Sequence, residues 1–154
     1  MNLTGKKIVI LTTSMKHIRL LAKELKGKNS IEKIYAQGLS GGKGKMMSLF
    51  QREREKVVLI GLIDTWIDES DLWACTDEVI IAKVPFDPPT DPYFLARTVG
   101  MKNNFEEYST PIALHTINTL IGRIRVSNPK TMIFCTDERI TTMNWGIMMR
   151  ESFI

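Results

Sequence analysis

Two continuous apolar runs, KVVLIGLI (56–63) and EVIIAKVP (78–85), constrain the fold more than any other feature. They are rich in β-branched residues and do not alternate with polar ones, which is typical of strands buried on both faces of a parallel sheet. Further strands are predicted at 7–14, 31–37 and 131–136, and helical patterns near 17–27, 46–55, 93–104, 111–124 and 141–152. This alternation predicts an α/β domain with a mostly parallel β-sheet flanked by helices on both faces.

The carboxyl ends of the predicted strands are the first places to look for a site, because open parallel sheets bind ligands there. These ends fall at 12–14, 61–66, 84–92 and 136–139. The third contains FDPPTDP (86–92), whose three prolines remove backbone donors and fix φ, so it is predicted to be neither helix nor central strand. With no internal repeat and no linker, 154 residues suit one well-buried domain.

The net charge of +4 conceals an asymmetry along the chain. Residues 1–56 hold 13 Lys/Arg and 4 Asp/Glu, a net of +9, whereas residues 57–154 hold 8 and 13, a net of −5. A basic half suits a polyanion such as nucleic acid, although solvated Lys-rich faces are also common in proteins that bind none.

The sequence gives no reason to expect a membrane protein. No apolar run approaches the roughly 18 residues that a membrane helix needs. The apolar start is strand-like and no cleavage site follows it, so we expect no signal peptide. Cys75 and Cys135 lack metal-ligand spacing and are predicted to be reduced core residues of a cytosolic protein.

The glycine-rich stretch SGGKGKM (40–46) suggests a phosphate loop but fails on spacing. A Walker A loop reads G-x-x-x-x-G-K-[S/T], and here Lys45 is followed by Met46. A flexible basic loop that starts a helix is the favoured interpretation, and a supporting role on a nucleic-acid backbone is the alternative.

Other candidate sites in the sequence are weaker. His17 and His115 lie in amphipathic segments without a neighbouring ligand cluster, so each is expected to be a surface or packed histidine. An acidic group follows the strand at 56–63 and consists of Asp64, Asp68, Glu69 and Asp71. It could bind Mg²⁺, but a solvated loop with N-capping carboxylates is favoured, and we assign no metal ligand.

The segment GRIR (122–125) closes the helix predicted to start near Pro111. Arginines near a helix C-terminus interact favourably with the macrodipole, so simple capping explains them. The alternative is an arginine that reaches a phosphate held by another domain, as an arginine finger does.

The order of these motifs is more specific than any one of them. The chain reads TTS, YAQG, VVLIGLIDTW, IIAKVPFDPPTDP, IGRIR and CTDERI. This series resembles the C-terminal motor domain of superfamily 2 DNA helicases of the DinG/XPD type, over about residues 6–150. The segment from Lys83 to Pro92 is its most specific piece, since the family typically shows Lys-x-Pro-Phe-x-x-Pro-x-x-Pro.

The resemblance implies a RecA-like fold, with residues 1–154 as a single helicase C-terminal domain of a longer chain. This would be the second of two motor lobes that hold ATP and Mg²⁺ between them and move along single-stranded DNA. The N-terminal lobe, in cis or in trans, would bind most of the ATP, because this chain has no Walker A motif and no DEAH-type acid. No iron–sulfur cluster is expected in this chain, and the location implied is the cytoplasm, on the nucleoid.

Matching the family's motifs residue by residue assigns roles to this chain. Arg123 matches the finger arginine and would be catalytic, with Gly122 and Arg125 beside it at the ATP. Asp137 and Arg139 match a final Asp-x-Arg that would brace the arginine motif. The residues implied in DNA binding are Thr13, Ser14, Gln37, Gly38, Lys43, Lys45 and Trp66.

Two motifs depart from the family pattern. Thr119 stands in place of the expected Gln, and Val126 in place of the second arginine. After Trp66, residues 67–70 read Ile-Asp-Glu-Ser where the family has Glu-Gly-x-Asp. Two hypotheses therefore remain: a divergent motor lobe, or an ATPase-inactive, helicase-derived module that binds DNA or protein.

Overall fold

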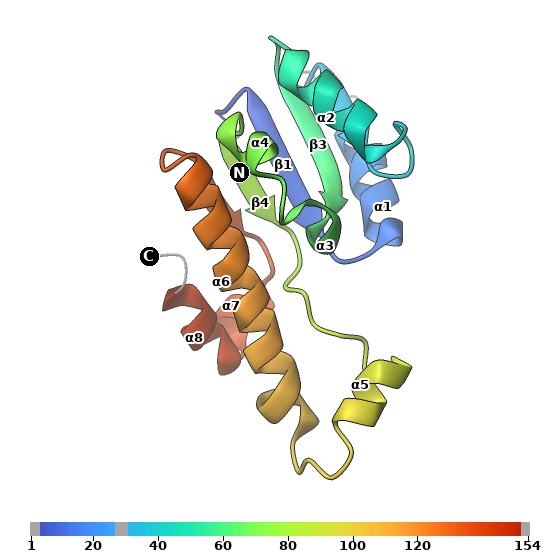
Figure 1. The fold of residues 1–154 in the computed structure, drawn as a ribbon, viewed down its shortest axis with the longest axis vertical. Helices are drawn as coiled ribbons and strands as arrows, with labels where there is room; N and C mark the ends of the chain where they lie inside the picture. Colours follow the sequence, from blue (N-terminus) through green and yellow to red (C-terminus); the bar gives the residue numbers. More distant parts are fainter. Residues whose placement is uncertain (1–3, 27–30, 152–154) are drawn as a thin grey trace.

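A single five-stranded sheet forms the centre of the molecule (Figure 1). The computed structural model describes residues 4–26 and 31–151. The strands are β1 (Lys7–Thr12), β2 (Lys33–Ala36), β3 (Val57–Leu62), β4 (Glu78–Ile81) and β5 (Met132–Cys135). Every neighbouring pair is parallel, in the order β2-β3-β1-β4-β5. The predicted α/β fold with a parallel sheet is confirmed, and it is consistent with a RecA-like domain.

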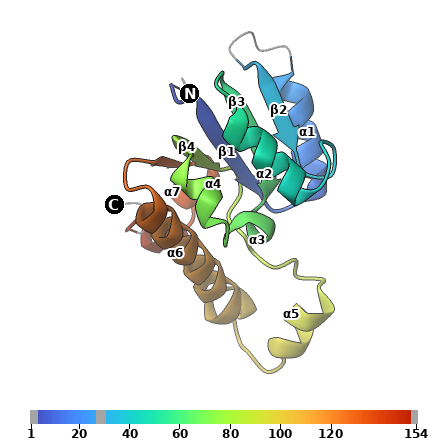
Figure 2. The ribbon, with the colours of Figure 1, turned by 45° about the horizontal axis from the view of Figure 1, so that its top comes forward.

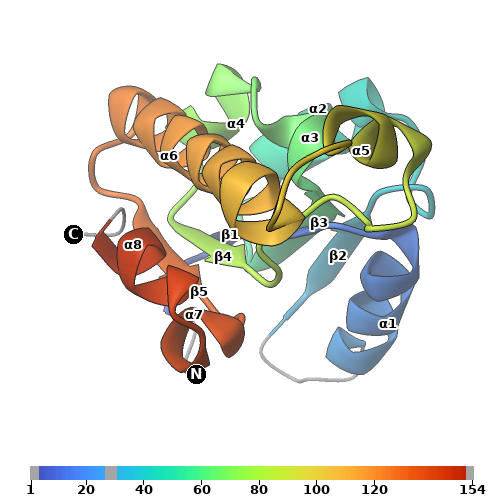
Figure 3. The ribbon, with the colours of Figure 1, turned by 90° about the horizontal axis from the view of Figure 1, so that it is seen from below.

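Helices cover both faces of the sheet. They are α1 (Met15–Leu25), α2 (Lys43–Arg52), α3 (Ile63–Trp66), α4 (Ser70–Ala74), α5 (Pro92–Arg97), α6 (Thr110–Ser127), α7 (Arg139–Thr142) and α8 (Trp145–Glu151), with a π-helical turn, η1 (Phe105–Ser109), before α6. Figure 3 shows α2, α3, α4 and α6 over one face, and α1, α7 and α8 over the other.

The central strands supply side chains to both faces because successive residues of a strand point in opposite directions. In β1, Val9 and Leu11 join the core under α2, α4 and α6, whereas Ile8 and Ile10 join the core under α1. All four are buried, as the continuous apolar runs predict for two-sided strands. Burial on both faces therefore places β1 in the interior of the sheet, between two layers of helices.

Three helix predictions were wrong in extent. The predicted helix at 93–104 ends at Arg97 as α5, and Gly100 then turns the chain with φ +84°. The predicted helix at 141–152 is two short helices, because Met143 adopts an extended conformation between α7 and α8. The glycine-rich loop at 39–45 is already helical from Lys43, where α2 begins.

Helix α5 and the first half of α6 extend away from the sheet (Figures 1 and 2). The proline-rich segment that leads to α5 forms no regular element from Pro85 to Asp91, as predicted. Asp91 caps α5 by accepting hydrogen bonds from the N–H groups of Tyr93 and Phe94. Among the described residues, no helix is both long enough and apolar enough to cross a bilayer.

Candidate functional site

The carboxyl edge of the sheet holds a cavity of about 260 Å³. Its walls come from the ends of β1 and β3, from the proline-rich segment and from α6. The lining residues are Thr12, Thr13, Leu62, Ile63, Asp64, Pro85, Phe86, Asp87, Pro88, Ile112 and Thr116. Three of the four strand ends predicted from the sequence therefore line one cavity. The fourth, 136–139, contributes no lining residue.

The turn from β1 to α1 presents two of the predicted DNA-binding residues. Thr13 and Ser14 are exposed, and the Ser14 hydroxyl caps α1 by accepting a hydrogen bond of 3.2 Å from the backbone N–H of His17. The His17 imidazole is half-buried, with Nδ1 2.6 Å from Oγ1 of the buried Thr12. His17 is thus a packed residue that fixes this turn, as predicted.

Gln37 ties the ends of β2 and β3 together. Its Oε1 accepts hydrogen bonds from the Leu62 N–H (2.9 Å) and from the Trp66 indole N–H (3.0 Å). Its Nε2 donates to Thr65 at 3.0 Å. Trp66 is fully buried, and its indole lies so close to Gly61 that a Cβ there would clash with the ring.

Gly38 follows Gln37 and has a φ of +77°, which suits glycine and lets the chain turn out of β2. It is exposed at the carboxyl edge. Gln37 and Trp66 therefore shape the edge from within, whereas Gly38 lies at its surface.

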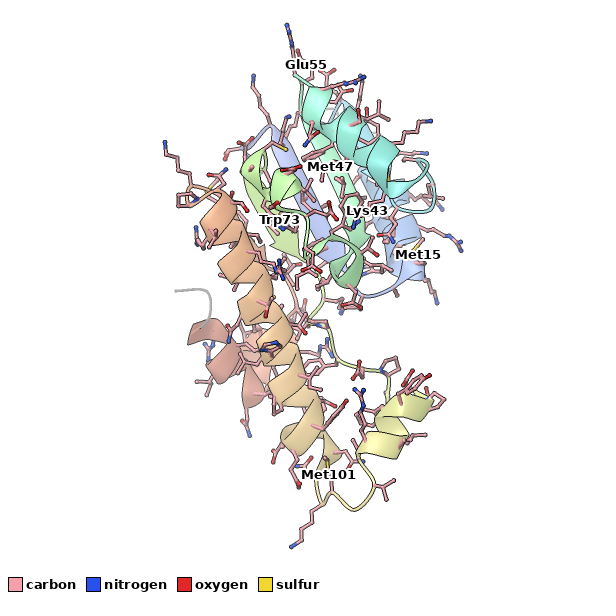
Figure 4. All side chains as sticks on the ribbon, viewed as in Figure 1. Met15, Lys43, Met47, Glu55, Trp73 and Met101 are labelled. Carbon is pink, nitrogen blue, oxygen red and sulfur yellow. The ribbon has the colours of Figure 1, made fainter. Side chains whose placement is uncertain are left out.

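Two basic residues from separate helices converge on the loop between α3 and α4. Lys43, the first residue of α2 and labelled in Figure 4, forms a 2.5 Å ion pair with Glu69. Its Nζ lies 5.7 Å from the centre of the Trp66 ring. Arg123 of α6 forms a 2.8 Å ion pair with Asp68. Lys45 is exposed on α2. The structure thus brings Lys43, Trp66 and Arg123 around one short acidic loop.

Arg123 lies in a shallow depression of about 340 Å³ on the α4–α6 side of the molecule. The depression is lined by Asp68, Ser70, Thr119, Gly122, Arg123, Val126 and Ser127. Both altered positions of the arginine motif, Thr119 and Val126, therefore border the same space as Arg123. The side chain of Arg123 is 49% exposed, and Val126 is 88% exposed.

Arg125 has other partners. Its guanidinium donates to the carbonyl oxygens of Pro129 (3.1 Å) and Thr131 (2.9 Å), which close the turn from α6 to β5. Binding a phosphate would require Arg125 to leave these two acceptors. In this position Arg125 stabilises the turn that follows α6, and not the last carbonyl groups of the helix that simple capping would involve.

Asp137 and Arg139 form a two-bond ion pair beside the proline-rich segment. Arg139 Nε donates to Oδ1 at 2.9 Å and Nη2 donates to Oδ2 at 2.6 Å, and the Val84 N–H also donates to Oδ2 at 2.9 Å. The guanidinium lies against the rings of Phe86 and Trp145. The pair thus holds the exit from β4. In the part of the chain that the structure describes, no hydrogen bond or ion pair joins it to the arginine motif on α6.

Burial of the Asp137 carboxylate favours its neutral form, but the hydrogen bonds from Arg139 and Val84 outweigh this and lower its pKa to about 2. Asp137 therefore stays ionised at neutral pH although it is nearly inaccessible to solvent.

The acidic group after β3 has a role that the sequence did not indicate. Asp68 and Glu69 pair with basic residues, and neither the α3 nor the α4 N-cap residue makes a side-chain capping bond. In the described ranges, no three His, Cys, Asp or Glu side chains gather as a metal site requires. These pairings join residues far apart in the chain, so the only local signal was the acidic run itself.

Comparison with known proteins agrees with this arrangement. A family model described as the helicase C-terminal domain matches residues 1–153. The chain is also 28% identical over 142 residues to the ATP-dependent DNA helicase YoaA of Haemophilus influenzae. That match covers 89% of this chain and 22% of the relative, so the chain spans about a fifth of the relative's length. With the parallel sheet and the ordered motifs, the whole-length family match places the chain in the helicase C-terminal domain family.

Proposed function

We propose that the chain is the second motor lobe of an ATP-dependent DNA helicase of the DinG type. It would be one RecA-like domain of a longer protein, with a first lobe that carries Walker A and binds most of the ATP and Mg²⁺. This chain would supply an arginine finger and half of the track for single-stranded DNA.

The observation that supports this proposal best is the state of Arg123. It is half-exposed, and within residues 4–26 and 31–151 its only ion-pair partner is the exposed carboxylate of Asp68. An ion pair between exposed groups contributes roughly 0–1 kcal/mol, so a phosphate can replace the carboxylate at little cost. Arg125, only two residues away, is held by two backbone carbonyls. Arg123 is therefore the arginine of this motif that is available to a γ-phosphate from another lobe.

The aspartate at position 68 distinguishes this chain from the family motif. It stands where the family motif carries a glycine, which has no side chain to pair with an arginine. We propose that Asp68 holds Arg123 in an extended, oriented position until ATP arrives between the lobes. The guanidinium would then donate to the γ-phosphate oxygens and stabilise the charge that develops on them.

The DNA track would follow the carboxyl edge. Thr13, Ser14 and Gly38 lie at its surface and would approach the phosphates, with Lys43 and Lys45 supplying positive charge. Gln37 and the buried Trp66 would act by holding the loops that carry these contacts.

A test of the finger joins this lobe to a Walker-bearing first lobe and measures ATP hydrolysis stimulated by single-stranded DNA. Arg123→Ala should lower the rate by roughly 10³- to 10⁵-fold, and Arg125→Ala should leave it largely intact. An unchanged rate in Arg123→Ala would refute the finger.

The second candidate is a module that binds DNA or protein without ATP chemistry. The exposed Val126 favours it, because a hydrophobic side chain occupies the place of the second arginine. Under this function the joined lobes hydrolyse no ATP, and Arg123→Ala leaves binding unchanged. The mass of the native polypeptide in its source cells adds a second criterion, since a motor needs the first lobe in the same chain or in a partner.

A further inference from the structure

The outward face of α1 carries a line of basic side chains that no role above uses. Lys16, Arg19, Lys23 and Lys26 follow one another at helical spacing, and all four are exposed. The opposite side of the helix, with Ile18 and Ala22, is buried against the sheet. At 1.5 Å per residue this line, called here the α1 stripe, runs for about 15 Å.

In the described part of the chain, the α1 stripe is not neutralised by ion pairs, although α1 also carries the exposed Glu24. Within residues 4–26 and 31–151, no carboxylate forms an ion pair with any of its four members. The first turn of α1 has no acidic residue, although the macrodipole favours anions at a helix N-terminus. Lys16 and Arg19 therefore add positive charge where the helix already carries it. An external anion would relieve this repulsion.

The α1 stripe is continuous with the carboxyl edge. Ser14 lies in the same shallow groove of about 450 Å³ as Lys16, Arg19 and Lys23. Burial, followed by the positive charge of Lys83, lowers the pKa of His17 in this groove. Lys83 comes from the chain that leaves β4, so a second segment adds to the positive field near the start of α1.

We propose that the α1 stripe extends the single-stranded DNA track. It would carry the phosphate backbone from the carboxyl edge along the face of the sheet opposite α6 (Figure 3), the helix that contains Arg123. The inference rests on the DNA-binding part of the proposed function. Lys and Arg bind phosphates without reading bases, so this contact is independent of sequence. An anionic membrane fits less well, because the only large apolar side chain that α1 exposes is Leu20.

The test measures binding of a fluorescent oligo-dT to the 154-residue chain between 50 and 200 mM salt. The stripe variant is Lys16→Gln, Arg19→Gln and Lys23→Gln, which keeps good helix formers on α1. The control is Lys102→Gln, Lys130→Gln and Arg150→Gln, at three exposed positions away from α1. Each triple change removes three charges, which takes the net charge from +4 to +1.

Each phosphate contact to a single strand contributes about −0.7 to the slope of log K against log salt. Because three charges are removed, the slope for the stripe variant should be shallower than that of wild type by about 2. The fourfold rise in salt should therefore weaken wild-type binding by about 20-fold more than it weakens binding of the stripe variant. The control should keep the wild-type slope.

Equal losses in the two triple variants would overturn the inference, because they would report net charge alone. So would an unchanged stripe variant, or a stripe variant that loses binding to phosphatidylserine vesicles but not to DNA. A separate variant, Lys43→Gln with Lys45→Gln, reports on the carboxyl edge. If it weakens DNA binding while the stripe variant matches wild type, the proposed function stands and the α1 stripe fails. If the wild-type chain binds no DNA at low salt, both fail.

Discussion

Two Asp–Arg pairs in this molecule have similar chemistry and opposite surroundings. Asp137 is buried, bound by Arg139 through two hydrogen bonds, and also accepts one from the Val84 backbone. Asp68 is 68% exposed and meets Arg123 through a single 2.8 Å contact. The Asp137–Arg139 pair holds the main chain at the exit of β4 through the Val84 N–H, whereas the Asp68–Arg123 pair is an ion pair between two exposed side chains. The two arginine side chains are similarly exposed, at 40% for Arg139 and 49% for Arg123, so the burial of the carboxylate is what distinguishes the two pairs.

The largest expected effect is on the buried pair. Asp137→Ala leaves the Val84 N–H and the Arg139 guanidinium without their acceptor, and should lower the free energy of unfolding by about 3 kcal/mol. Urea denaturation of the 154-residue chain measures this. Asp68→Ala is the matched control and should cost less than about 0.5 kcal/mol. Equal losses of unfolding free energy in the two variants would contradict the structural role assigned to Asp137.

The stability of the chain should depend on pH through Asp137. The folded state lowers the pKa of Asp137 from 3.8 to about 2, so folding favours the ionised form. This stabilisation is complete above about pH 4 and is lost as the pH falls through about 2; it amounts to about 2 kcal/mol. Thermal melts between pH 5 and pH 2 should show a smaller acid-induced loss in Asp137→Asn than in wild type. Parallel curves for the two proteins would contradict the assignment.

A smaller effect separates the two arginines of α6. Arg125→Ala removes two hydrogen bonds to carbonyl oxygens and should cost about 1 kcal/mol of unfolding free energy. Arg123→Ala should change stability by less than about 0.5 kcal/mol, because its one bond is exposed. Denaturation curves of the two single variants test this order, and the reverse order would make Arg123 the structural residue.

The smallest effect concerns the carboxylate that holds Arg123. Asp68→Asn removes an exposed ion pair worth at most about 1 kcal/mol. If phosphate must displace Asp68, the variant should bind nucleotide between the joined lobes up to about fivefold more tightly. Titration with a fluorescent ATP analogue measures it, and Asp71→Asn, another exposed acid after β3, is the control. Weaker binding in Asp68→Asn would mean that the carboxylate orients Arg123 more than it competes for it.

The sequence predicted the sheet and the place of the site more fully than it predicted the partners within the site. The central strands β3 and β4 were predicted because continuous apolar runs such as 57–60 have no other stable position than between two helical layers. Ion pairs such as Lys43–Glu69 and Arg123–Asp68 could not be predicted, since they need three separate elements to meet. The burial of Trp66 was missed for the same reason, because it depends on Gln37 and Gly61 together.

The end of α6 illustrates how local sequence can mislead. Arg123 and Arg125 look alike in GRIR, and only their different partners distinguish them. The helix predicted at 141–152 had a continuous pattern, but Met143 interrupts it with an extended residue. Such breaks are set by packing, here of Ile140 and Met149 against Val84 and Ala113, and not by local propensity.

The most direct test of the central claim measures trapping of ADP with aluminium fluoride, a mimic of the transferring phosphoryl group, by this lobe joined to a Walker-bearing first lobe. A finger acts on the transition state, so its loss should weaken the mimic far more than it weakens ADP alone. We predict that wild type and Arg125→Ala trap the complex and that Arg123→Ala does not. Trapping by Arg123→Ala as strong as that of wild type would contradict the assignment of Arg123 as the finger.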